Sequence, residues 1–167
     1  MADITKVLSK ASNPRKGLPE DVFLLISQLT PMMNVELLIK DEKLGTLLTW
    51  RHDELYGPAW HLPGGIIRFK EFALTRINKV AQSELGAAVV VENGPIEVHE
   101  IMNDERDIRG HFISLLYQCK LKSDLKEDLK FSDEFPVNGY WRWFRECPEN
   151  LLSQHERYRK RIGLNNT

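Results

Sequence analysis

The sequence predicts an α/β protein in which a mixed β-sheet is sandwiched between helices. Three observations support this prediction. Short runs rich in apolar and β-branched residues have strand patterns, one amphipathic helical stretch separates the early runs from the late ones, and two more helical stretches precede the first strand. Strands on both sides of a single long helix are typical of a mixed sheet covered on its faces.

The first thirty residues are expected to form an N-terminal helical extension. Residues 3–10 and 19–30 have helical patterns, and the second begins with Pro-Glu-Asp, which suits the first turn of a helix. Residues 31–167 are expected to form one globular domain, since the whole chain of 167 residues is long enough for one core. The extension either caps the sheet or contacts a second copy of the chain.

The strand patterns begin with a predicted hairpin, because residues 35–40 and 46–51 are joined by a polar turn that contains Gly45. The run at 112–120 is the densest in apolar and aromatic residues, so we expect it to be central and buried. The remaining predicted strands are 60–62, 87–91, 95–102 and 140–144, and the tail from Pro148 has a helical pattern.

The stretch that bears chemistry is a Pro-Gly-Gly loop followed by a helix from about Glu71 to Leu85. Positions 80 and 84 are four apart and therefore share a helix face. Two carboxylates there would form a site for a hard cation, but this chain has Val80 and Glu84. Mg²⁺ is often held by one or two carboxylates together with substrate phosphates, so one carboxylate is compatible with a weak site.

Gly65, Glu71, Glu84 and Gly86 are spaced as in the box of the Nudix hydrolases, Gly-x5-Glu-x7-Arg-Glu-U-x-Glu-Glu-x-Gly-U, where U is aliphatic. The chain resembles this family over roughly residues 34–144. The resemblance implies the Nudix fold and a hydrolase that acts on a diphosphate linked to another group.

Three positions depart from that pattern, since Lys79 replaces Arg and Val80 and Ser83 replace Glu. In this respect the chain looks most like the GDP-mannose mannosyl hydrolase branch, whose box is also shortened to one late Glu. The resemblance rests further on the sequences at 35–39, 47–51 and 60–65. It implies a nucleoside diphosphate sugar as substrate, with attack at the sugar carbon.

The branch implies Mg²⁺ as cofactor, with Mn²⁺ as the alternative ion, and release of a free hexose and a nucleoside diphosphate. Two other functions remain open at this point. One is a conventional diphosphatase that attacks phosphorus and recruits Asp133 or Glu134 to its metal. The other is a catalytically silent module that binds a nucleotide, which the missing acids favour.

Metal and substrate residues are carried over by position. The resemblance implies that the main-chain carbonyl near Gly65 and the carboxylate of Glu84 bind the metal. Arg51 matches an arginine on the diphosphate, with a salt bridge at the strand end as its alternative role. Glu36 matches an acid near the sugar. Arg68 and Arg109 are further candidates for substrate contact.

Catalytic assignments are less direct. Glu71 is expected to hold the loop and the helix together through Lys79. The branch has a Gln metal ligand and a His base near its C-terminal strand, but the matching positions here are Val137 and Asn138, and neither can act as a base. His111 opens the most buried predicted strand and is the candidate base, with a structural hydrogen-bonded histidine as the alternative.

Composition limits the partners and the compartment. The net charge of −1 gives no basic footprint for nucleic acid, and no apolar run has the length of a transmembrane helix. The N-terminus lacks the apolar core of a signal peptide, and the two cysteines have no metal spacing. We therefore expect a cytoplasmic protein with a small-molecule substrate, no nucleic acid and no membrane partner. The branch is dimeric, which implies a homodimer.

Overall fold

The protein is described from a computed structural model, which covers all residues except 1–3, 12, 55, 133–134 and 165–167. Two of the residues considered above, Asp133 and Glu134, lie outside the described residues. Within the described part of the chain, no helix is long and apolar enough to cross a membrane.

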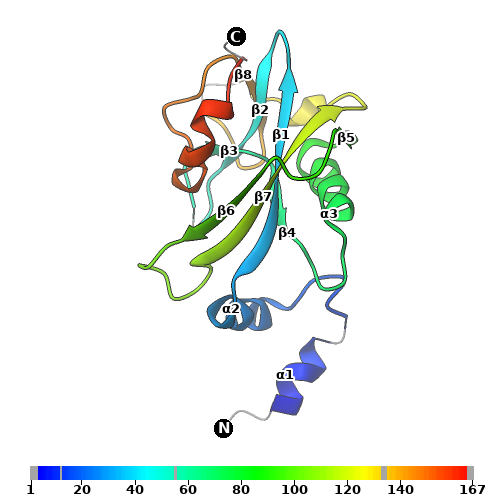
Figure 1. Ribbon diagram of the computed structural model, residues 1–167, viewed down its shortest axis with the longest axis vertical. Coiled ribbons are helices and arrows are strands. Elements are labelled where there is room, and N and C mark those ends of the chain that lie inside the picture. The colour runs from blue at the N-terminus through cyan, green and yellow to red at the C-terminus, as the bar shows by residue number, and fades with distance from the viewer. Residues whose placement is uncertain (1–3, 12, 55, 133–134, 165–167) are drawn as a thin grey trace.

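The molecule is built on one eight-stranded mixed sheet (Figure 1). Its centre is a parallel pair, β1 (Met32–Asp41) and β7 (His111–Leu121), in which Val35 is level with Leu115. The order along the sheet is β3, β2, β1, β7, β5, while β4 pairs with β1, β6 with β7 and β8 with β2. The bounds of the other strands are Gly45–Arg51 (β2), Ala59–His61 (β3), Gly64–Ile66 (β4), Val89–Val91 (β5), Glu97–Met102 (β6) and Trp141–Phe144 (β8).

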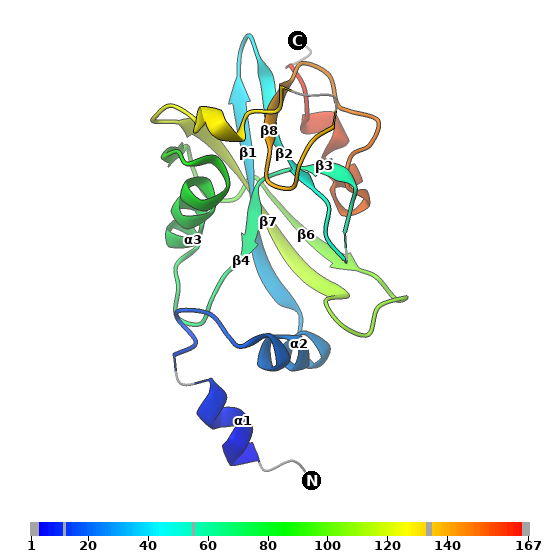
Figure 2. The ribbon, with the colours of Figure 1, turned by 180° about the vertical axis from the view of Figure 1, so that it is seen from behind.

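Two hydrophobic clusters cover the two faces of the sheet, because successive side chains of a strand point in opposite directions. Leu37 of β1 packs with Ile77 and other residues of helix α3 (Ala73–Val80), whereas Leu38 packs with Tyr158 of the C-terminal 3₁₀ helix (Ser153–Arg161). These two elements flank the sheet on opposite sides, as a view from behind also shows (Figure 2). The predicted fold class is confirmed.

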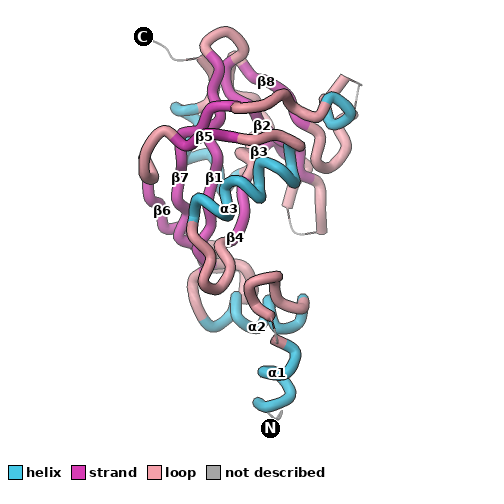
Figure 3. The backbone as a smooth tube through the Cα atoms, turned by 90° about the vertical axis from the view of Figure 1, so that its right-hand side faces the viewer, coloured by secondary structure: helices cyan, strands magenta, loops and turns pink. Residues whose placement is uncertain are grey.

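The N-terminal extension contains helices α1 (Ile4–Lys10) and α2 (Glu20–Leu29), as predicted. Helix α2 lies at one end of the sheet, where its buried residues are Val22 and Ser27. Helix α1 has no buried residue and projects away from the body of the molecule (Figure 3).

Two helical segments differ from the sequence-based prediction, and residues Gly64–Ile66 of the predicted loop form the short strand β4. The helix of the box is α-helical only to Val80 and continues as a π-helical segment, Ala81–Leu85, which ends at Gly86 with a φ of 63°. The tail, predicted as a helix from Pro148, begins its helical part only at Ser153 and is 3₁₀-helical. Both differences affect the candidate site.

Candidate active site

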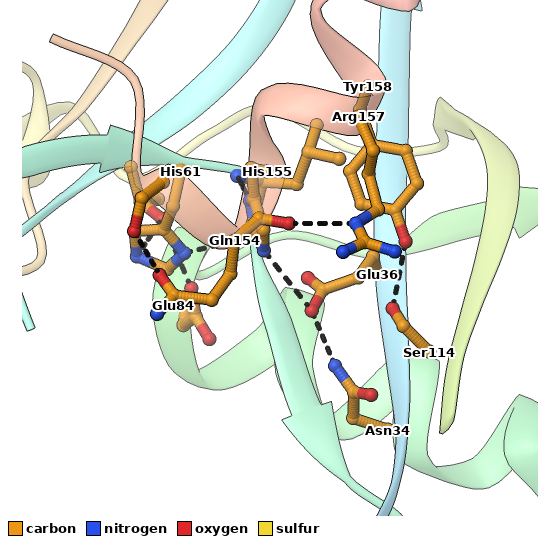
Figure 4. A network of polar contacts seen from close by, with 12 residues as sticks. Asn34, Glu36, His61, Glu84, Ser114, Gln154, His155, Arg157 and Tyr158 are labelled. Atoms are coloured by element: carbon orange, nitrogen blue, oxygen red, sulfur yellow. Dashed lines mark hydrogen bonds and ion pairs between the residues drawn. The ribbon is translucent and has the colours of Figure 1, made fainter. Parts of the chain in front are cut away.

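A pocket of about 420 Å³ opens where β1, β2, the Gly-Gly loop and the C-terminal 3₁₀ helix meet. Five residues singled out from the sequence line it: Glu36, Arg51, Gly65, Glu84 and Arg109. The structure thus brings these five together from five separate segments of the chain. Figure 4 shows the network of polar contacts around the two glutamates.

Glu84 reaches the pocket from the π-helical segment. Its Oε2 lies 3.2 Å from the hydroxyl of Thr49 on β2. Burial, and then the nearby charge of Glu36, raise the pKa of Glu84 to about 8, although hydrogen bonds from the Gly64 amide and Thr49 act in the opposite direction. Among the described residues no cationic side chain forms an ion pair with Glu84, so a bound metal ion would supply the positive charge that this buried carboxylate needs.

Glu36 is the second buried carboxylate of the pocket and is 5% exposed. Its Oε1 accepts a hydrogen bond from Asn34 Nδ2 at 2.5 Å and lies 3.3 Å from His155 Nε2. Glu36 Oε2 and Asn34 Oδ1 are buried without a hydrogen-bond partner among the described residues. A Cβ atom on Gly64 would lie 2.1 Å from that Oε2, so the close approach of the loop requires glycine there.

Two histidines fix the peptide of Leu62, immediately before the Pro-Gly-Gly loop. His155 Nδ1 accepts from the Leu62 amide at 3.0 Å, and His61 Nδ1 donates to the Leu62 carbonyl at 2.7 Å. His155 therefore carries its proton on Nε2 and can donate it to Glu36. His61 is neutral, because burial, and then the charges of His155 and Arg51, lower its pKa to about 3.

The hydroxyl of Thr49 connects His61 to Glu84, the candidate metal ligand. Thr49 Oγ1 lies 3.1 Å from His61 Nε2 as well as 3.2 Å from Glu84 Oε2. One hydroxyl proton cannot serve both acceptors, so the protonated form of Glu84, which its raised pKa favours, completes this chain of hydrogen bonds. Each buried carboxyl group is thus linked through a histidine to the same peptide.

Positive charge gathers around Tyr56 on the more exposed side of the pocket. The guanidinium carbons of Arg51, Arg106 and Arg109 lie 4.4, 4.5 and 5.4 Å from the centre of its ring. Arg51 also donates to Asp53 at 2.6 Å, the salt bridge considered as its alternative role. The Nε of Arg109 is buried with no acceptor in the part of the chain that the structure describes. Guanidinium groups in this arrangement suit phosphate oxygens.

Three of the predicted site residues lie outside the pocket. Glu71 accepts hydrogen bonds from the Arg68 amide at 3.0 Å, from Arg76 at 2.6 and 2.8 Å and from Lys79 at 2.9 Å. Burial alone would raise the pKa of Glu71, but the bonds from Lys79, Arg68 and Arg76 lower it to about 2. Glu71 therefore joins the loop to the helix, with Arg76 as an additional partner that the sequence did not indicate.

The side chain of Arg68 points to the N-terminal extension, where its Nη1 donates to the carbonyl of Lys16. His111 pairs with Glu100 at 3.0 Å, whereas Phe112 lines the pocket. Since neighbouring residues of a strand face opposite sides, a base at position 111 is directed away from the pocket occupied by residue 112. Neither Arg68 nor His111 is therefore brought to Glu84.

Sequence reasoning missed the pair Gln154 and His155, which line the pocket from the C-terminal 3₁₀ helix. The backbone brings them there through Trp60 of β3, whose amide donates to Asn150 and whose carbonyl accepts from Leu152. A Gln-His dipeptide was visible in the sequence, but 17 places after the position where the resemblance placed it. Asn138, found at that position, also lines the pocket and accepts from the His52 amide.

The oxygen atoms that line the pocket could provide only some of the ligands of a hard cation. Among the described residues no group of three or more His, Cys, Asp or Glu side chains could hold a metal ion by itself. The pocket does contain the Glu84 carboxyl group, the partnerless Oε2 of Glu36 and the main chain of Gly65. Oxygen donors of this kind suit Mg²⁺, which takes its remaining ligands from water and substrate phosphates.

No family model matches the chain. The "Low-salt glycan biosynthesis protein Agl8" of Haloferax volcanii is 28% identical over 120 residues, which are 70% of this chain and 76% of the relative.

Several solved structures match the fold of the chain at lower sequence identity. The MutT protein from Methanosarcina mazei Go1 matches with a TM-score of 0.58 and 18% identity, over 79% of this chain and 93% of its own. A UDP-X diphosphatase matches with a TM-score of 0.55 and 19% identity, over 90% and 69%. A Nudix hydrolase from Nitrosomonas europaea matches with a TM-score of 0.52 and 17% identity, over 68% and 73%. The chain therefore has the fold of the Nudix hydrolases.

Proposed function

We propose that the protein is a Mg²⁺-dependent hydrolase of nucleoside diphosphate sugars of the GDP-mannose type, and that it releases the free sugar and a nucleoside diphosphate. Mn²⁺ is the alternative ion. The proposal assigns the metal to Glu84 and the main chain of Gly65, and the diphosphate to Arg51 and Arg109. Glu36 contacts the sugar.

The polarity of the pocket is the observation that carries this proposal. Its buried side offers two acceptors without a donor, Asn34 Oδ1 and Glu36 Oε2, and its more exposed side offers the guanidinium groups of Arg51 and Arg109. A buried acceptor without a donor is unfavourable, so a ligand should bring hydroxyl groups to this end. It should also bring negative charge to the arginines. A sugar joined to a diphosphate has hydroxyl groups at one end and negative charge at the other.

The same groups suit attack at the sugar carbon. Water adds to the anomeric carbon, the bond from that carbon to the diphosphate oxygen breaks, and the nucleoside diphosphate leaves with the bonding electrons. Glu36 Oε2 accepts the proton of the water, while His155 Nε2 and Asn34 Nδ2 hold the other oxygen of this carboxylate. Bound Mg²⁺ would supply positive charge to the departing diphosphate.

The box of this chain lacks two of the family's glutamates, at positions 80 and 83. Their absence favours attack at the sugar carbon over attack at phosphorus. Val80, in the place of the first Glu of the acid cluster, is packed in the hydrophobic core, where its Cγ2 would be 2.8 Å from a Cβ on Gly65. The helix thus offers a single carboxylate to the pocket. A diphosphate leaving group needs less added positive charge than an attacked phosphorus held by several metal ions.

The likeness to a glycan biosynthesis protein supports an activated sugar as substrate. The nucleotide and the sugar are to be identified with a panel of nucleoside diphosphate sugars incubated with Mg²⁺. Free sugar plus nucleoside diphosphate is the expected pair of products. Sugar phosphate plus nucleoside monophosphate would support a conventional diphosphatase, and binding without turnover would support a silent module.

Glu84→Gln is the variant that removes the metal carboxylate without changing its shape, and it should abolish turnover. Glu42→Gln is the matched control, because Glu42 is exposed on the turn between β1 and β2. Equal turnover by both variants would remove Glu84 from the metal site.

A further inference from the structure

The end of the molecule formed by the N-terminal loop and the loop before α3 exposes two aromatic side chains. Phe69 is 60% exposed and Phe72 is 83% exposed. Both lie on the segment between β4 and α3, and Lys70 between them lies with its ammonium 5.3 Å from the ring centre of Phe69. We propose that this end of the protein docks on an anionic lipid bilayer, with the two rings at the level of the headgroups.

The segment that carries these rings is held at both ends. The Nη1 of Arg68 donates to the carbonyl of Lys16 in the N-terminal loop, and the carboxylate of Glu71 accepts from the Arg68 amide and from Arg76. Lys70 has a φ of 55°, a left-handed conformation that is rare for a lysine. The rings are therefore exposed by a fixed turn, and they are not covered by the described part of the chain.

The charge of this end differs from that of the whole protein. Residues 4–21 and 66–79 contain eight Lys and Arg but only three Asp and Glu, whereas the whole chain has a net charge of −1. One of these acids, Glu71, is already neutralised by Arg76 and Lys79, and Asp21 is paired with Lys10. The structure shows no acidic partner within 4 Å, among the described residues, for Arg15, Lys16 or Lys70.

Exposed aromatic rings among cations are the combination that binds peripheral proteins to anionic bilayers. Helix α1 adds Ile4 and Leu8, which are four residues apart on one side of the helix and 66% and 65% exposed. This mode of binding departs from the sequence-based expectation of no membrane partner, but it needs no transmembrane segment. It is therefore compatible with the finding that no described helix could span a membrane.

A second copy of the chain is a less suitable partner for the same surface. In a two-fold symmetric dimer the same patch meets itself, so Arg15, Lys16 and Lys70 would face identical cations. Like charges brought together at an interface oppose association. An anionic bilayer, in contrast, attracts each of these cations, and its acyl region accepts the apolar rings.

Co-sedimentation of the full chain with vesicles tests the proposal. One set of vesicles contains phosphatidylcholine alone, and the other contains phosphatidylcholine with phosphatidylglycerol. The protein should bind only the second set, and added salt should release it. The variant Lys16→Ala with Lys70→Ala should lose roughly 25-fold in affinity, because each cation near the surface contributes about fivefold. Phe69→Ala with Phe72→Ala should also weaken binding.

The matched control is Phe135→Ala with Lys160→Ala, which removes an exposed ring and an exposed cation from elsewhere on the molecule. It should bind vesicles as the unchanged protein does. Equal binding to both sets of vesicles, or equal loss in the control variant, would overturn the proposal. So would a mass measurement in which the patch variants dissociate a dimer while the unchanged protein ignores anionic vesicles. Since none of these residues lines the pocket, hydrolysis of a soluble substrate should be unaffected, and the result is independent of the proposed activity.

Discussion

The two glutamates of the box are Glu71, in the loop just before α3, and Glu84, on the π-helical segment that follows α3, and their environments shift the pKa of the carboxyl group in opposite directions. The pKa of Glu71 is lowered to about 2, while the pKa of Glu84 is raised to about 8. Glu71 is surrounded by donors from Arg68, Arg76 and Lys79. Glu84 has only the hydroxyl of Thr49, the amide of Gly64 and the charge of Arg51 to offset burial and the charge of Glu36.

This difference teaches which glutamate stabilises the fold and which one is available for chemistry. A carboxylate with all its charge neutralised by the protein has no need of a metal ion, whereas a buried carboxyl group without a cation has a place for one. Glu71 should therefore be essential for stability, and Glu84 for activity.

The largest expected effect is on turnover by Glu84→Gln. Loss of the carboxylate that binds the metal removes several kcal/mol of transition-state stabilisation, so kcat should fall at least about a hundredfold. The melting temperature should stay the same or rise, because the buried carboxyl group destabilises the metal-free fold above its ordinary pKa. Measurement of kcat and of thermal unfolding checks both parts, and a melting temperature lowered as much as in Glu71→Gln would contradict the distinction.

The next effect is on stability, in Glu71→Gln. Glu71 and Arg76 have side chains only 5% and 10% exposed, and the substitution leaves the guanidinium without its charge partner. We expect a loss of about 3 kcal/mol in the free energy of unfolding. Urea unfolding at neutral pH measures it, with Glu42→Gln as the exposed control. A loss no larger than that of the control would show that the bonds of Glu71 are not needed for the fold.

The same pair of proteins sharpens the comparison as a function of pH. The pKa of Glu71 is about 2 when folded and close to 4.5 when unfolded, so the unfolded chain takes up the proton first as the pH falls. The stability from Glu71 is then complete above pH 4.5 and is lost progressively between pH 4.5 and 2. The difference in unfolding free energy between the unchanged protein and Glu71→Gln should shrink over that range. A constant difference would contradict the lowered pKa.

The smallest effect is expected for Lys79→Ala. Lys79 stands where the family box has Arg, but its side chain is 52% exposed, and the buried Arg76 already neutralises Glu71. Exposed ion pairs contribute little, so the loss should be under about 1 kcal/mol. Urea unfolding of this variant and of Arg76→Ala compares the two losses in unfolding free energy. A larger loss in Lys79→Ala than in Arg76→Ala would show that Lys79 is the more important partner of Glu71.

Much of the fold could be predicted from the sequence because it depends on local patterns. The hairpin at Gly45, the central strand at 112–120 and the two N-terminal helices all follow from periodicity and turn residues, and the structure confirms them. The loop and helix of the box were found from the spacing of Gly65, Glu71 and Glu84, because all three lie in one short continuous segment of the chain.

The rest of the site depends on contacts between distant segments, which local patterns do not contain. His155 contacts a peptide 93 residues earlier in the chain, because β3 binds the segment before the C-terminal 3₁₀ helix. The direction of the His111 side chain depends on which face of β7 meets the pocket. Phe112 faces the pocket, so His111, the neighbouring residue, points to the other face. The π-helical turn that carries Glu84 has no recognised sequence signal in this chain.

Hydrolysis in water enriched in oxygen-18 tests the central claim most directly, namely that this site, with Glu84 as the single carboxylate of its helix, directs water to the sugar carbon. The protein is incubated with Mg²⁺ and with a nucleoside diphosphate sugar that it was found to hydrolyse in the panel. The masses of both products are then measured by mass spectrometry. We predict that the label enters the free sugar and that the nucleoside diphosphate remains unlabelled. Label in a phosphate product would place the attack at phosphorus and contradict the claim.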